Sequence, residues 1–137
     1  MESTKLIEFR YRPKDDFLIR ASWEELYSLT SHWISELTFY ADEILFFERL
    51  LKTHNSMKDP KLEEMDHMII DMNVQLRSIV KQTDEHLNHI IQFLKGNPDQ
   101  AYLFREEHNV LEDTIVAFTK EFQTLRRTLF AEMEVYV

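Results

Sequence analysis

Histidine and glutamate residues at helical spacing are the side chains of this 137-residue chain best suited to chemistry. His86 and His89 are three residues apart, and Glu112 follows His108 by four. Residues at these separations share one face of a helix. Imidazole together with carboxylate suits one divalent transition metal, such as zinc or iron. The candidate ligands are His86, His108 and Glu112, with His89 or Glu36 in reserve.

The same histidines also fit a structural role, as a polar layer within a helical core. His86 and His108 stand at positions that Leu, Ile, Met and Phe otherwise occupy, and Thr30 and Thr83 interrupt apolar stripes in the same way. Buried polar groups are tolerated when each finds a hydrogen-bond partner. We favour this layer of Thr30, Thr83, His86 and His108 over the metal site.

Known metal-binding bundles support that preference. Di-iron carboxylate bundles use two Glu-x-x-His pairs and two further glutamates, whereas here only Glu64 and His67 have that spacing. Adjacent glutamates such as Glu106 and Glu107 diverge by about 100° around a helix, so we interpret them as solvated surface. Metal binding therefore remains the alternative hypothesis.

Three apolar stripes, repeating every three and four residues, must position these groups. Ser22 with Glu25 has the spacing of a helix-capping box, and Asp59 before Pro60 is typical of a helix start. Gly96 can adopt the left-handed backbone that closes a helix. We therefore expect helices at about 22–54, 60–95 and 98–135. Their short loops predict an all-α, elongated antiparallel three-helix bundle of coiled-coil type.

The first 21 residues have a different pattern. Ile7, Phe9 and Tyr11 alternate with charged residues, which is the period of a strand. An isolated strand is not stable by itself. We expect residues 1–21 to form an N-terminal extended arm, and residues 22–137 to form the bundle.

The first helix carries apolar residues beyond its core stripe. Phe39, Leu45 and Phe46 lie off that stripe, and Phe39 and Phe46 are seven residues apart. Exposed phenylalanines leave a large apolar area in water. The N-terminal arm could cover them, or a second copy of the chain could. We favour a homodimer, because cyclic pairs are the commonest oligomers.

Composition excludes several classes of function. The net charge of −9 disfavours nucleic-acid binding, and the lack of cysteine excludes thiolate metal sites. One glycine cannot supply a phosphate-binding loop, so we lean against an enzyme. We find neither a signal peptide nor an apolar run of membrane-spanning length, and expect a cytoplasmic protein. The predicted function is a helical interaction or scaffolding module that binds itself or another helical protein.

Overall fold

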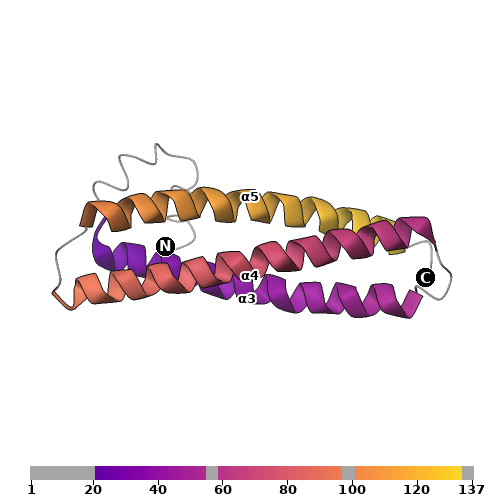
Figure 1. Ribbon diagram of the computed structural model, residues 1–137, viewed down its shortest axis with the longest axis horizontal. Helices are drawn as coiled ribbons and strands as arrows, with labels where there is room; N and C mark the ends of the chain where they lie inside the picture. Colours follow the sequence, from indigo (N-terminus) through magenta and orange to yellow (C-terminus); the bar gives the residue numbers. More distant parts are fainter. Residues whose placement is uncertain (1–20, 55–58, 97–100, 134–137) are drawn as a thin grey trace.

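The computed structural model describes residues 21–54, 59–96 and 101–133, which form three long helices. They are α3 (Trp23–His54), α4 (Pro60–Leu94) and α5 (Ala101–Met133). In Figure 1 the helices lie side by side, and α4 runs opposite to α3 and α5. The predicted all-α antiparallel three-helix bundle is confirmed. Most of the predicted arm, and the predicted ends of the third helix at 98 and 135, lie outside the described residues.

The helix ends carry the capping contacts that their residues predict. The Ser22 hydroxyl accepts a hydrogen bond from the Glu25 backbone N–H at 3.1 Å. The Asp59 carboxylate accepts from the Lys61 N–H at 3.0 Å, ahead of the proline that starts α4. Gly96 follows α4 with a φ of 101°, the left-handed conformation that side chains with a Cβ disfavour. These contacts satisfy backbone groups that lack partners at a helix end.

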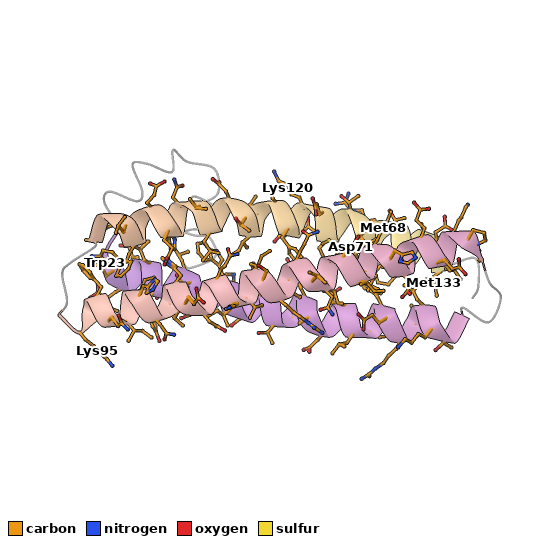
Figure 2. All side chains as sticks on the ribbon, viewed as in Figure 1. Trp23, Met68, Asp71, Lys95, Lys120 and Met133 are labelled. Carbon is orange, nitrogen blue, oxygen red and sulfur yellow. The ribbon has the colours of Figure 1, made fainter. Side chains whose placement is uncertain are left out.

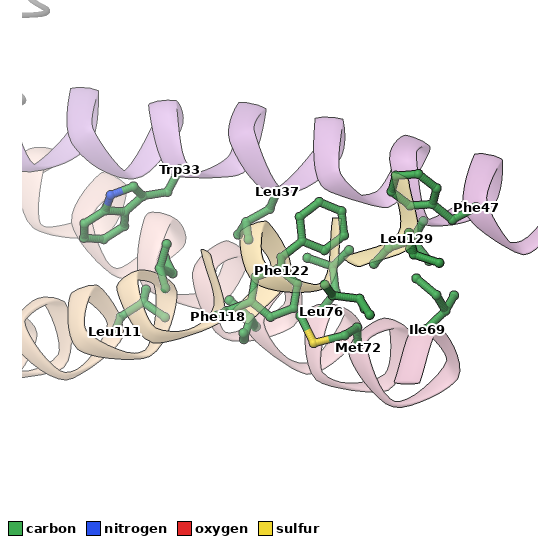
Figure 3. Close-up of a cluster of buried hydrophobic side chains, with 14 of the residues drawn as sticks. Trp33, Leu37, Phe47, Ile69, Met72, Leu76, Leu111, Phe118, Phe122 and Leu129 are labelled. Atoms are coloured by element: carbon green, nitrogen blue, oxygen red, sulfur yellow. The ribbon is translucent and has the colours of Figure 1, made fainter. Parts of the chain in front are cut away.

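A continuous apolar core runs along the bundle and comes from the three stripes. Leu26, Leu37, Ile44, Ile69, Ile90 and Phe122 have no exposed surface. Figure 3 shows core side chains from all three helices meeting between the ribbons. Fully burying one such side chain contributes about 1.5–3 kcal/mol. The predicted stripes therefore correspond to the observed core.

The outer surface of the bundle is mostly polar. In Figure 2 side chains such as Lys95 and Lys120 project away from the helices, and both are exposed. Within the described residues, no helix has an apolar stretch that could cross a membrane.

Aromatic side chains bridge α3 and α5. The backbone of α4 runs close to those of both other helices, whereas large rings span from α3 to α5. The Tyr40 and Phe122 ring centroids lie 5.0 Å apart, and those of Phe47 and Phe130 lie 5.6 Å apart. Trp33, Tyr40 and Phe47 repeat every seven residues and therefore line one face of α3. We call the junction that they fill the α3–α5 seam.

Candidate functional site

The two mid-bundle histidines meet inside the core. His86 on α4 and His108 on α5 have no exposed surface, and His86 Nε2 lies 2.8 Å from His108 Nδ1. They stand at similar distances from the turn that joins the two antiparallel helices, which brings them to the same level. This contact is a direct hydrogen bond between two imidazole rings.

A carboxylate from α5 contacts the second ring nitrogen of His86, the one that does not face His108. Glu107 Oε1 lies 2.6 Å from His86 Nδ1 and 2.8 Å from His89 Nδ1. The side chains of Glu107 and His89 are only partly buried, with 37% and 36% of their surface exposed. The group therefore extends from the core to the protein surface. We call Glu107, His86, His89 and His108 the histidine layer.

With Glu107 ionised and His86 neutral, the hydrogen-bond pattern assigns the position of each ring proton. An ionised carboxylate can only accept, so His86 Nδ1 and His89 Nδ1 both donate to Glu107. A neutral His86 then presents a lone pair at Nε2, and His108 Nδ1–H donates to it. His108 thus donates to His86, and His86 donates to Glu107. His89 donates separately to the same carboxylate oxygen.

Burial and a nearby charge act on His86 in opposite directions. Burial lowers the pKa of His86 below its ordinary value, because a charged ring would lose its hydration. The hydrogen bond and negative charge of Glu107 partly oppose this effect, while the nearby His89 adds to the lowering. The net lowering of the pKa favours neutral His86 at pH 7.

On α3, an aromatic ring covers the layer. The Trp33 and His108 rings stack with centroids 4.5 Å apart and planes 27° apart. Phe104 of α5 stacks on His89 of α4, with the ring centroids 4.7 Å apart. The Trp33 contact helps to exclude water from the His108 ring, whereas His89 keeps an exposed edge.

The two predicted threonines are buried but form separate hydrogen bonds. The Thr30 and Thr83 hydroxyls each donate at 2.7 Å to a carbonyl four residues earlier in their own helix. This local bonding is common for threonine within helices and satisfies the buried hydroxyl without a partner from another helix. Thr30 and Thr83 interrupt the apolar stripes, as the sequence indicates, but these two hydrogen bonds stay within their own helices and do not join the threonines to the histidines.

The other two candidate ligands, Glu112 and Glu36, are not among the partners in the three hydrogen bonds described above. Glu112 is buried on α5, one turn beyond His108. Glu36 on α3 forms an ion pair with His32 at 2.9 Å. In residues 21–54, 59–96 and 101–133, no group of three or more His, Asp or Glu could hold a metal ion.

The spacing of the two buried rings also fits a hydrogen bond better than a shared metal. Two nitrogens bound to one tetrahedral zinc would lie about 3.3 Å apart, given zinc–nitrogen distances of about 2.0–2.1 Å. The observed separation of His86 and His108 is 2.8 Å. The metal hypothesis therefore gains no support from these residues.

Glu107 is the member of the layer that the sequence analysis missed. The sequence pattern predicts a solvated side chain there, because the adjacent Glu106 and Glu107 diverge by about 100° around a helix. Glu107 is nine residues after Pro98 and His86 is ten residues before Gly96, and these similar distances from the turn were the available signal. A carboxylate at the edge of a helix pair can reach across to a ring at the same level.

A second feature is apolar and lies on the surface of the α3–α5 seam. Phe39 and Phe46 on α3 are 62% and 55% exposed, and Phe130 on α5 is 50% exposed. The ring of buried Phe47 contacts those of Phe46 and Phe130 at 5.7 and 5.6 Å. Phe46 from α3 and Phe130 from α5 therefore both pack against Phe47. We call Phe39, Phe46 and Phe130 the seam face.

An ion pair joins the two helices within this face. Arg126 Nη2 donates to Glu43 Oε1 at 2.6 Å, and the guanidinium lies 5.1 Å from the centre of the Phe122 ring. Glu43 stands between Phe39 and Phe46 along α3, at helical spacing from both. Leu45 is 48% exposed, but it lies about 100° around α3 from Phe46 and away from this face.

Comparisons with known proteins give no relative for this chain. No known protein family, curated protein or solved structure matches it. The chain is therefore a three-helix bundle with two notable features. One is the histidine layer, whose His86 and His108 are buried, and the other is the exposed apolar seam face.

Proposed function

We propose that this chain is a helical interaction module that forms a homodimer through the seam face. The observation that carries the proposal is that Phe39, Phe46 and Phe130 are each at least half exposed, and that Phe46 and Phe130 both contact the ring of Phe47. Each exposed phenylalanine leaves on the order of 100 Å² of apolar surface in water, and burying that area contributes about 2.5 kcal/mol. A contiguous apolar patch with a polar rim is typical of a protein-binding surface.

A second copy of the chain suits this surface. In a two-fold dimer the same patch serves on both subunits, so it must be complementary to itself. The seam face meets this requirement because it combines phenylalanine rings with one charge of each sign, Glu43 and Arg126. Helices of a second copy packed along α3 and α5 would extend the existing core.

The remaining properties follow from composition and are part of the same proposal. The net charge of −9 repels nucleic-acid phosphates, so the partner is a protein. A chain without cysteine is compatible with the reducing cytoplasm, where we place the module.

Sedimentation equilibrium of the full chain at micromolar concentration tests the dimer. We expect a dimer for the natural sequence and a monomer with unchanged helical circular dichroism for Phe39→Ser combined with Phe46→Ser. The matched control is Ile70→Ser with Val74→Ser, which alters two exposed apolar residues of α4. That control should remain dimeric. A natural chain that sediments as a monomer would overturn the proposal.

A further inference from the structure

We propose that the histidine layer is a pH-sensitive lock that holds α4 against α5 near neutral pH and opens at mildly acidic pH. This role is independent of the proposed dimer, because the layer joins two helices of one chain. The geometry that carries it is the direct bond between two fully buried rings, His86 and His108, closed on one side by Glu107.

Counting protons shows why this arrangement responds to acid. In the neutral layer each nitrogen–nitrogen or nitrogen–oxygen contact has one proton. Adding a proton to His86 Nε2 keeps the contact only if His108 moves its own proton from Nδ1 to Nε2. The carboxylate of Glu107 balances that single positive charge.

A second proton cannot be accommodated. His108 Nδ1–H and His86 Nε2–H would then face each other across 2.8 Å, with no acceptor between them. Two positive charges would also lie at short range in a site from which water is excluded. When both rings are protonated, His86 and His108 must move apart so that water can reach them, and this separates α4 from α5.

The groups around the layer place no acceptor between these two N–H groups, which are in direct contact. On α4, His89 shares Glu107 with His86 and becomes a further positive charge when protonated. On α5, Glu112 is buried one turn beyond His108. On α3, Trp33 presents an uncharged ring to His108, and the nearby charged groups, His32 and Glu36, pair with each other.

The direction of the pH effect follows from the linkage between protonation and opening. Burial lowers the pKa of His86, so an open, hydrated His86 binds protons at a higher pH than the closed one does. Opening is therefore suppressed above about pH 6.5, the ordinary histidine value. As pH falls below 6.5 toward the lowered pKa, the opening equilibrium rises by up to about tenfold per pH unit for each extra proton taken up.

Hydrogen exchange of backbone amides, followed by NMR from pH 7.5 to 5 and corrected for the intrinsic pH dependence of exchange, tests the lock. For the natural chain we expect the opening equilibrium of amides around residues 83–90 and 104–111 to rise at least several-fold as pH falls. Amides around 69–76, in the first half of α4 and away from the layer, should respond less. The double variant His86→Leu with His108→Leu should lose the response. His67→Gln, which changes an exposed histidine of the same helix, should keep it.

A second variant separates the electrostatic role of Glu107 from mere packing. Glu107→Gln keeps an acceptor oxygen but removes the negative charge, so the His86 ring should titrate at a lower pH, as read from its NMR signals. An unchanged titration midpoint in Glu107→Gln would overturn the proposal. So would a pH response that survives in the double leucine variant, or that is absent from the natural chain.

Discussion

His108 donates to His86 Nε2 where neither ring has exposed surface, so this nitrogen of His86 relies on His108 as its donor. Replacing only His108 by leucine removes the donor to His86 Nε2 and leaves a buried acceptor without it. We expect this single change to lower the free energy of unfolding by about 1–3 kcal/mol at pH 7.5. Replacing both rings by leucine removes both polar groups, and apolar replacements of this kind are often neutral or stabilising.

Urea unfolding at pH 7.5 measures these differences, with a double-mutant cycle that includes His86→Leu. We expect the double variant to be more stable than either single variant. The midpoint should be read at a fixed protein concentration, because any dimerisation adds to apparent stability. A double variant that loses the sum of the two single losses would show that the rings contribute independently.

At this scale, the sequence indicates the buried pair but not the whole layer. Two histidines in apolar stripes, each about ten residues from a predicted turn, are enough to predict that they face each other. The sequence does not indicate that Glu107 reaches His86, because that contact depends on side-chain conformation at the edge of the helix pair. Nor does it show that Thr30 and Thr83 bond within their own helices.

Among the elements, the end of α4 depends on one backbone conformation. Gly96 has a φ of 101°, and a Cβ added there would meet no atom within 4 Å. Gly96→Ala should therefore cost about 1–2 kcal/mol of folding free energy from backbone conformation alone. Gly96→Asn should cost less, since asparagine adopts this conformation more readily. Thermal unfolding of the two variants measures the difference, and equal losses would indicate a cause other than backbone conformation.

The helices themselves are the part of the structure that the sequence determines most fully. Capping residues and seven-residue apolar repeats are local, so Asp59, Pro60 and Gly96 locate the ends of α4 in the sequence and in the structure. The seam face is less predictable. Phe39 and Phe46 stand out on α3 from the sequence, but the contact that Phe130 makes with Phe47, beside Phe46, depends on how α5 packs beside α3.

In the whole molecule, the two features occupy different interfaces of one bundle. The histidine layer joins α4 to α5 in the half that contains their connecting turn. The seam face joins α3 to α5, and its residues Phe46 and Phe130 lie in the last turns of those helices. Acid opening of the layer and association through the seam are thus separable by mutation, which allows each proposal to fail without the other.

Two phenylalanines of α5 distinguish the stability of the bundle from its association. Phe122 is fully buried, with Tyr40 5.0 Å and Phe118 6.0 Å away between ring centroids. Phe122→Ala should leave a cavity in the seam and lower the free energy of unfolding by about 3–5 kcal/mol. Phe130 is half exposed, so Phe130→Ala should cost the monomer far less but weaken dimerisation. Urea unfolding at low concentration measures the first effect, and sedimentation the second. If Phe130→Ala left the dimer intact, the seam would not be the interface, because its apolar area on α5 depends on that ring.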